Sequence, residues 1–342
     1  MAEITIYTLA KELNMTPSMV SRAFNPSARI SEEKRKIVME AAKKYNFSPN
    51  RLASRLSMKT VRIGIIINSN FQVNTEKMLT GIKQAHDNLK DYKVQYDITL
   101  LKTADTVTPE LRQAVDNYKS YDGVILSGMS ASHYTELIDS LYKVNPNIVQ
   151  VQAINQKANY LFASKHNERV ASEIAAEFLY NCLRMSKRKN VLLFTGDLKS
   201  SLHTCVAESF KCTCDKLGLD LLATADMKDN EEYFEKIIPE FFGKYGDLAD
   251  GIYISSGLSA PLCRYLAENN YDIPFVAFDS YEEIKEYMKK NVITATIAQN
   301  VTRQMEIAFE LLVKHLIMGE ECPRTVYTDV QLVLKGNIHQ FD

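Results

Sequence analysis

The chain has 342 residues and a nearly balanced charge, with 41 Lys and Arg against 42 Asp and Glu. This length exceeds that of one small domain and suggests two or three domains with buried cores. No apolar run approaches transmembrane length and no secretory signal opens the sequence, so we expect neither a membrane-spanning nor an exported protein. The expected location is the cytoplasm, where the six cysteines would be reduced thiols.

The charge is unevenly distributed along the chain. Residues 1–60 hold eleven Lys and Arg against five Glu, a net charge of +6, while the remaining 282 residues have a net charge of −7. A solvated surface would account for most of these cations individually, but their concentration in one small unit favours contact with phosphates. The cations in question are Arg22, Arg29, Lys34, Arg35, Arg51, Arg55 and Lys59.

The N-terminal sequence predicts a helix, a tight turn and a second helix. An apolar stripe at helical spacing covers residues 6–13, and another covers residues 17–24. Thr16 can cap the second helix, and Pro17 suits its first position, where no amide hydrogen is needed. An ordinary helical corner is the structural alternative. The other side of the second helix carries groups that a DNA major groove could accept, namely Ser18, Met19, Ser21 and Arg22.

A third helix is predicted over residues 31–45, with Ser31 as its cap, two acids in its first turn and one apolar face. It would close a compact three-helix unit. After a break at residues 47–50, residues 51–58 predict a further helical segment. Because this segment is only about two turns long, it should fold only when paired or bound.

From Val61 onward, apolar runs of strand length alternate with amphipathic runs of helix length. This alternation is typical of a parallel sheet that is covered on both faces. The series starts again after Tyr160 with a strand at YLFAS. We therefore predict an α/β fold with two doubly wound, parallel-sheet lobes behind an all-α N-terminal domain.

The sequence matches no catalytic or metal-binding pattern in full, and its tightest grouping of such residues is at 203–214. Cys212 and Cys214 are two apart on a predicted helix and would face different ways, so with His203 and Cys205 they predict no metal site. No Gly-rich phosphate loop, His-Glu-x-x-His motif or Gly-x-Ser-x-Gly motif is present, which disfavours an enzyme. A transport binding protein would fit residues 61–342 but would need an export signal and no basic helix-turn-helix unit. We expect no cofactor.

Residues 5–60, TIYTLAKELNMTPSMVSRAFNPSARISEEKRKIVMEAAKKYNFSPNRLASRLSMKT, resemble the DNA-binding head and hinge of the LacI/GalR repressor family. The resemblance implies a helix-turn-helix DNA-binding domain at residues 1–49, a hinge at residues 50–60 and a periplasmic-binding-protein-like sensor at residues 61–342. In such a sensor the chain crosses between the lobes three times, and we expect crossings near residues 155–160, near Asn291 and near Arg324.

These crossings would give a first lobe of about 61–157 plus 292–322 and a second lobe of about 158–291 plus 323–342. The helix at residues 303–318 would then belong to the first lobe. The final strand, TVYTDVQLVL, would belong to the second lobe.

The resemblance also assigns DNA contacts. Pro17, Ser18 and Arg22 take the base-reading positions, Ser21 would bind phosphate, and Leu56 takes the place of the leucine that wedges between bases in the minor groove. Because Pro17 and Ser18 are small, we expect more reliance on Arg22 and on DNA shape. The expected DNA contacts are Thr5, Tyr7, Thr16, Pro17, Ser18, Ser21, Arg22, Asn25, Arg29, Asn50, Arg51, Ala53 and Leu56.

Side chains that directly follow strands are candidates for a ligand site, because ligands of open α/β sheets bind beyond the carboxyl ends of the strands. Loop polar residues are often mere turn formers, but the resemblance supports Asp279 and adds Gln299 and Val206. The expected ligand contacts are Asn68, Phe71, Ser127, His166, Asn167, Val206, Asp279 and Gln299.

Two of these positions depart from the family pattern. His166 stands where the family usually has an Asp, and Val206 stands where it usually has an Arg. Loss of a guanidinium removes several charge-assisted donors at once, so an ordinary hexose or pentose bound in the ordinary way is disfavoured. A modified ligand, a phosphorylated metabolite and a sensor that has lost its ligand all stay open.

The sequence thus predicts a DNA-binding transcriptional regulator, a repressor that binds a near-palindromic operator as a homodimer. A small-molecule effector between the lobes, sugar-like by resemblance, would control its affinity for double-stranded DNA. The alternative is a DNA-binding regulator whose sensor body only dimerises and has lost its ligand. A dimer is expected because the C-terminus has no leucine heptad that could hold a tetramer.

Overall fold

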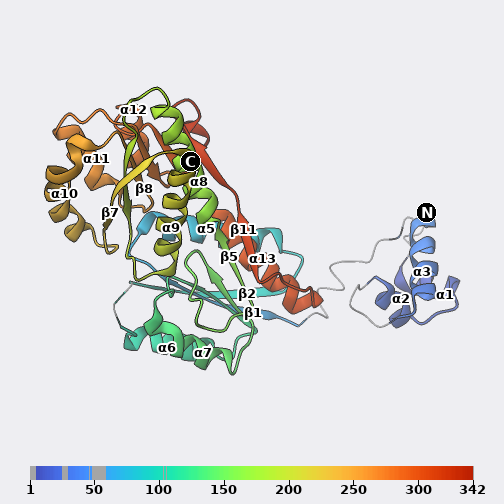
Figure 1. Cartoon of the computed structure of the whole chain (residues 1–342). Coiled ribbons are helices and arrows are strands. Elements are labelled where there is room, and N and C mark those ends of the chain that lie inside the picture. The colour runs from blue at the N-terminus through green and yellow to red at the C-terminus, as the bar shows by residue number, and fades with distance from the viewer. Residues whose placement is uncertain are drawn as a thin grey trace.

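The computed structural model describes residues 5–24, 30–45, 47, 59–102, 104 and 106–341. The N-terminal head contains α1 (Ile6–Glu12), α2 (Pro17–Ala23) and α3 (Glu32–Lys44) (Figure 1). The core of the head contains Leu9 of α1, Val20 of α2 and Val38 of α3, which are all fully buried. The predicted three-helix unit is confirmed, whereas the predicted hinge helix at residues 51–58 lies outside the described residues.

The turn between α1 and α2 forms as the sequence predicts. Asn14 takes a left-handed backbone conformation, with φ of 53°, which Asn tolerates better than most residues. The hydroxyl of Thr16 then accepts a hydrogen bond from the Met19 amide over 3.2 Å, and Pro17 occupies the first turn of α2. This cap satisfies one of the amides that a helix start leaves without a partner.

The first lobe is built on a six-stranded parallel sheet in the order β11-β5-β4-β3-β1-β2. Its strands are β1 (Val61–Asn68), β2 (Val94–Leu101), β3 (Gly123–Ser127), β4 (Ile148–Val151), β5 (Phe162–His166) and β11 (Thr325–Thr328). One face packs against α5 (Gln72–Asn88) and α13 (Val301–Met318), and the other packs against α6 (Pro109–Tyr118) and α7 (Thr135–Tyr142), which follows the short helix η1 (Ser132–Tyr134).

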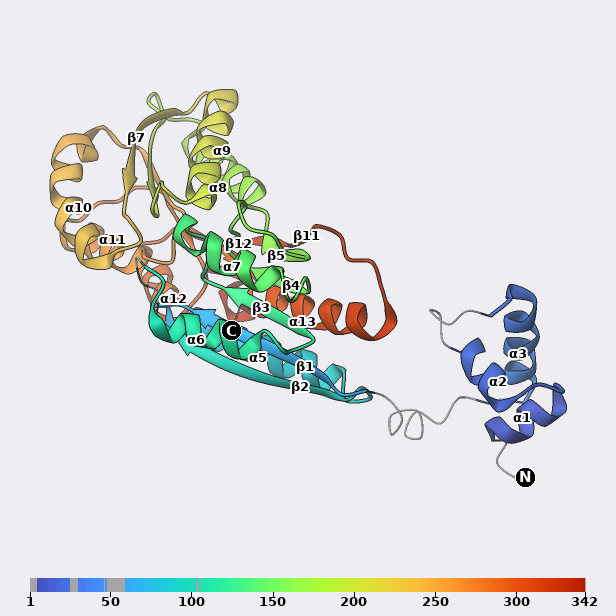
Figure 2. The ribbon, with the colours of Figure 1, turned by 90° about the horizontal axis from the view of Figure 1, so that it is seen from below.

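The second lobe repeats the arrangement around the order β12-β10-β9-β8-β6-β7. Its strands are β6 (Asn190–Thr195), β7 (Asp220–Asp226), β8 (Gly251–Ile254), β9 (Phe275–Phe278), β10 (Ala295–Gln299) and β12 (Val330–Val333), of which β12 alone is antiparallel to its neighbour. The helices are α8 (Glu168–Leu183) and α9 (Ser201–Leu217) on one face, and α10 (Glu231–Tyr245), α11 (Ser259–Glu268) and α12 (Glu282–Lys289) on the other, with η2 (Gly246–Leu248) and η3 (Ile338–Gln340). Figure 2 shows α8 to α11 gathered apart from α5 to α7.

Strand pairing corrects the expected crossings between lobes, each of which lies further along the chain. The strand at YLFAS, expected in the second lobe, is β5 of the first sheet, so the first crossing follows His166. The strand β10 belongs to the second sheet, so the second crossing follows Gln299. The expected final strand divides at Asp329 into β11, which pairs with β5, and β12, which pairs with β10.

The physical reason is that sheet membership depends on which distant strand supplies the hydrogen bonds, and this information is not local to the strand. The predicted two-lobed α/β fold is nevertheless confirmed, as is the packing of α13 on the first lobe. Among the described residues, no helix combines the length and apolar character that crossing a lipid bilayer would need.

Candidate functional site

The outward side of α2 carries the side chains that the sequence predicts for DNA contact. Ser18, Ser21 and Arg22 are exposed, while Val20 and Ala23 of the same helix are buried in the head. Polar groups therefore line one side of a helix whose other side is fixed by packing. Of the other expected DNA contacts, Thr5, Tyr7 and Thr16 are exposed and Pro17 is half-buried, whereas Asn25, Arg29, Asn50, Arg51, Ala53 and Leu56 lie outside the described residues.

Two residues of the head serve its structure. The hydroxyl of Thr5 caps α1 and hydrogen-bonds to Thr8 over 2.7 Å. The guanidinium of Arg35, which was a candidate for phosphate contact, donates to the Ala23 carbonyl oxygen over 3.0 Å and so ties α3 to the end of α2. A cation at this position also suits the negative end of the helix dipole.

A cavity of about 270 Å³ lies where the strand ends of the two lobes face each other. We call it the interlobe cleft. Asn68, Phe71 and Ser127 line it from the first lobe, together with His166 at the end of β5. From the second lobe come Val206, Asp279 and Gln299. The structure thus brings together seven of the eight expected ligand contacts.

The eighth, Asn167, is not among the residues that line the cleft. Its side-chain oxygen accepts a hydrogen bond from the Val170 amide over 3.3 Å and caps α8. Its neighbour His166 lies on the cleft because consecutive residues leaving a strand point in different directions. Asn167 therefore has a structural task that its place after a strand does not reveal.

Asn68 is buried and fixes the floor of the cleft. Its amide nitrogen donates to the Gly128 carbonyl oxygen over 3.0 Å and to the Tyr134 hydroxyl over 3.1 Å. Gly128 has φ of +74°, and a Cβ there would come within 1.7 Å of the Asn68 carbonyl oxygen. Only glycine fits this close approach between the ends of β1 and β3.

His166, Asp279 and Gln299 line the same part of the cleft, at the ends of β5, β9 and β10. The nearby Gln299 side chain favours the charged form of both His166 and Asp279. Burial raises the pKa of Asp279 to about 6, against the opposing effects of the Lys77 charge and the Gln299 side chain. Burial lowers the pKa of His166 to about 4, so its imidazole is neutral at pH 7. At pH 7 the two side chains therefore present no positive charge to a ligand in the cleft.

Sequence reasoning missed a second polar group in the cleft, formed by His203 of α9 and Asp229 after β7. The His203 Nε2 lies 3.3 Å from Asp229 Oδ2, and its Nδ1 lies 3.3 Å from the Thr195 hydroxyl. Burial alone would raise the pKa of Asp229, but His203 and the Asp197 amide hold that pKa below its usual value. A Cβ on Gly196 would come within 2.1 Å of Asp229 and 2.3 Å of His203, so glycine makes room for the pair.

The signal for this pair was weak. In the sequence, His203 stands out only as a possible metal ligand beside Cys205, and within the described residues no group of three or more His, Cys, Asp or Glu could hold a metal ion. His203 lies one helical turn before Val206 on α9, and Val206 is the position where the family's usual Arg is missing. The structure thus places an imidazole and a carboxylate near the position that the missing guanidinium leaves apolar.

Residues 65–321 match the model of a family described as periplasmic binding protein domain. The chain belongs to this family. Catabolite control protein A of Staphylococcus epidermidis is 26% identical over 67% of this chain and 67% of its own length. Catabolite control protein B of Bacillus subtilis is 25% identical over 79% of this chain and 83% of its own length.

Solved structures agree on the fold of the sensor. A structure from Bacteroides fragilis is described as a putative LacI transcriptional regulator. It has a TM-score of 0.72 at 18% identity and covers 83% of this chain and 100% of its own. A glucose-galactose binding protein from Geobacillus stearothermophilus has a TM-score of 0.71 at 16% identity, covering 82% of this chain and 99% of its own. The chain thus shows distant homology, over most of its length, to the catabolite control proteins, which are LacI-family transcription regulators and not enzymes.

Proposed function

We propose that this chain is a LacI-family transcriptional regulator, a cytoplasmic repressor that binds a near-palindromic operator as a homodimer, with α2 in the major groove. The observation that carries the proposal is the exposed polar side of α2, with Ser18, Ser21 and Arg22, on a helix held by a buried core. Arg22 is the side chain best suited to read a guanine, because its guanidinium can donate two parallel hydrogen bonds to the base. The hinge segment with Leu56 would bend the centre of the operator.

The ligand of the interlobe cleft is an uncharged, hydroxyl-rich molecule such as a sugar derivative. Among the described residues, no Lys or Arg lines this cleft, whereas Asp229 and Asp279 both do. A phosphorylated ligand would bring negative charge toward two carboxylates with no lining Lys or Arg to balance it, which disfavours it. Phe71 and Phe278 add apolar faces from opposite lobes, against which the carbon skeleton of such a ligand can pack.

A ligand in the cleft would control DNA affinity through the angle between the lobes. The side chains that line the cleft come from both lobes. A bound molecule therefore favours the lobe separation at which side chains of both lobes contact it. It shifts the equilibrium only as far as its affinity differs between the two arrangements. The lobes would in turn set the separation of the two hinge segments in the dimer, and hence the fit to the operator.

The first test is selection from random DNA duplexes with the full chain at moderate salt, repeated with Arg22→Ala and Leu56→Ala. A near-palindromic motif is expected, with Arg22→Ala relaxing its flanks and Leu56→Ala weakening binding at its centre by about tenfold. Arg112→Ala, an exposed site on α6, is the matched control and should reproduce the parent motif. Salt-sensitive binding without any motif would contradict the proposal.

The second candidate function is a regulator whose sensor body only dimerises. The observation that favours it is the pair of departures at His166 and Val206, which remove a carboxylate and a guanidinium from the cleft. A thermal-shift screen of neutral sugars and polyols separates the two candidates, because a ligand that binds only the folded chain raises its unfolding midpoint. A shift that His203→Gln abolishes supports the ligand-controlled regulator. No shift from any neutral compound favours the dimerising body.

A further inference from the structure

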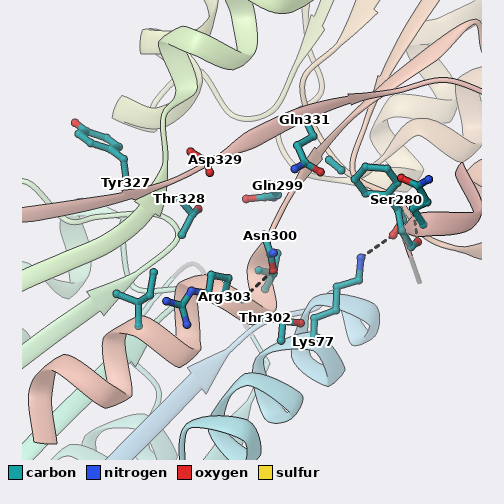
Figure 3. Close-up of a pocket in the computed structure, with 15 residues that line it drawn as sticks. Lys77, Ser280, Gln299, Asn300, Thr302, Arg303, Tyr327, Thr328, Asp329 and Gln331 are labelled. Atoms are coloured by element: carbon teal, nitrogen blue, oxygen red, sulfur yellow. Dashed lines mark hydrogen bonds between the residues drawn. The ribbon is translucent and has the colours of Figure 1, made fainter. Parts of the chain in front are cut away.

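A second cavity, of about 360 Å³, lies beside the crossings between the lobes (Figure 3). We call it the hinge cavity. Asn300 at the start of α13 and Thr328 and Asp329 of the third crossing line it, as do Lys77 of the first lobe and Gln331 of the second. Gln299 lines both this cavity and the interlobe cleft. A molecule held here would touch both lobes at the points where the chain passes between them.

The hinge cavity differs from the interlobe cleft in charge. Lys77 and Arg303 line it, whereas no Lys or Arg among the described residues lines the cleft. Lys77 donates one hydrogen bond, to the Ser280 carbonyl oxygen over 2.6 Å, and Arg303 forms an ion pair with Glu306 at 2.6 Å. An ammonium has three donors and a guanidinium has five, so both groups keep the capacity to bind an anion.

The start of α13 adds to the capacity of the hinge cavity to bind an anion. The helix runs for 18 residues, has no acid in its first turn, and presents Asn300, Thr302 and Arg303 to the cavity. The Asn300 side chain accepts only the Arg303 amide, over 2.9 Å. The remaining amides of the first turn have no helical partner, and the helix dipole is positive at this end.

An independent observation indicates that a partner is missing. The Thr328 hydroxyl is buried without a hydrogen-bond partner, and Thr328, which is 6% exposed, lines the cavity. A buried hydroxyl without a partner costs free energy. A ligand oxygen in the hinge cavity would satisfy it.

Asp329 is the acidic side chain among the residues that line the cavity, and its negative charge would orient an anionic ligand with the anionic group pointing away from it. Figure 3 shows it on the same crossing as Thr328, with Lys77 and Thr302 on helices at the other side. We propose that the hinge cavity binds a small organic anion, with a phosphate or carboxylate group toward α13 and Lys77 and with hydroxyl groups toward Thr328 and Asp329. The ligand would thus differ in charge from the one in the interlobe cleft, and its binding does not require the cleft to be occupied.

Calorimetric titration of the full chain at fixed ionic strength tests this proposal with matched probes. Glycerol 3-phosphate is compared with glycerol, and gluconate is compared with glucose. The anionic member of at least one pair should bind, and the neutral member should bind at least tenfold more weakly. Binding of the phosphate probe alone, or of the carboxylate probe alone, supports the proposal and identifies the charged group.

Variants then locate the binding site. Arg303→Gln should weaken anion binding about tenfold, because a charge-assisted hydrogen bond is lost. Lys314→Gln removes an equal charge from an ion pair on the same helix, with Glu310, and should leave binding unchanged. Thr328→Val keeps the side-chain shape and should weaken binding about threefold, and thermal unfolding without probe verifies that each variant is folded.

Equal affinities for Arg303→Gln and Lys314→Gln would overturn the proposal, as would anion binding that His203→Gln abolishes. The latter result would place the anion in the interlobe cleft. Failure of both anionic probes to bind would also overturn it, without affecting the proposed operator binding, which the DNA selection tests separately.

Discussion

Lys77 of α5 and Ser280 after β9 hold the two lobes together: the Lys77 ammonium donates a hydrogen bond to the Ser280 carbonyl oxygen over 2.6 Å. Burial lowers the pKa of Lys77, although the nearby Asp279 charge opposes this effect. The bond joins residues 203 positions apart and depends on the distance between the lobes. It therefore favours the lobe separation seen in this structure.

Replacing Lys77 by Met should loosen this arrangement. Loss of one hydrogen bond costs about 1 kcal/mol, so the thermal midpoint should fall by a few degrees and amide exchange should quicken at the end of β9 and the start of α12. Hydrogen exchange measured by mass spectrometry checks this. Lys83→Met, at an exposed site on the same helix, is the matched control. Identical exchange in the two variants would show that the bond does not hold the lobes.

The cap of α2 should matter for the stability of the head. Thr16→Ala removes the acceptor of the Met19 amide and should cost about 1 kcal/mol. Because α2 carries the side chains proposed to contact DNA, operator binding should weaken as well. Thr16→Ser retains the oxygen and should behave like the parent in thermal unfolding and in DNA binding. A loss of the same size with Ser would assign the effect to packing instead.

The pH dependence of stability should separate two buried groups. The pKa of His166 falls on folding from 6.5 to about 4, so its contribution to stability rises as pH increases across that interval. The pKa of Asp279 rises from 3.8 to about 6, so the folded state binds the extra proton and stability falls as pH increases from about 4 to about 6. In the parent protein the two contributions oppose each other.

Single variants should reveal each contribution. Asp279→Asn should leave a stability that rises between pH 4 and pH 6.5, and His166→Gln should leave one that falls between pH 4 and pH 6, each relative to the parent protein. The changes should be of order 2 kcal/mol. Urea unfolding at a series of pH values measures them. The same pH dependence of stability in the parent and in both variants would contradict the assigned pKa shifts of His166 and Asp279.

Gly196 should be essential to the polar group in the interlobe cleft. A Cβ at this position overlaps Asp229 and His203, so Gly196→Ala should displace the pair and weaken binding of a cleft ligand about tenfold. The control is Gly243→Ala, at a helical site where a Cβ meets no atom within 4 Å, which should leave binding unchanged and raise stability by up to about 1 kcal/mol. Anion binding in the hinge cavity should be the same in both variants.

The sequence by itself determined the features that depend on neighbouring residues. Thr16 and Pro17 define the start of α2 because a cap and a first-turn proline act within one helical turn. The alternation of apolar runs of strand length with amphipathic runs of helix length predicts α/β lobes. A parallel sheet that is buried on both faces needs apolar strands and helices that cover them. Asn68, Ser127 and Asp279 are predictable as cleft residues because Asn68 and Ser127 end β1 and β3 and Asp279 directly follows β9, and the carboxyl ends of the strands of both sheets face the cleft.

The tertiary structure alone decided the features that depend on distant pairing. The lobe to which β5 and β11 belong follows from the hydrogen bonds between them, which join residues from opposite halves of the chain. The approach of His203 to Asp229 depends on how α9 packs beside β7. The hinge cavity arises only where both lobes meet at the crossings. Local propensity cannot specify these contacts, because each requires two segments that the fold brings together only after both sheets have formed.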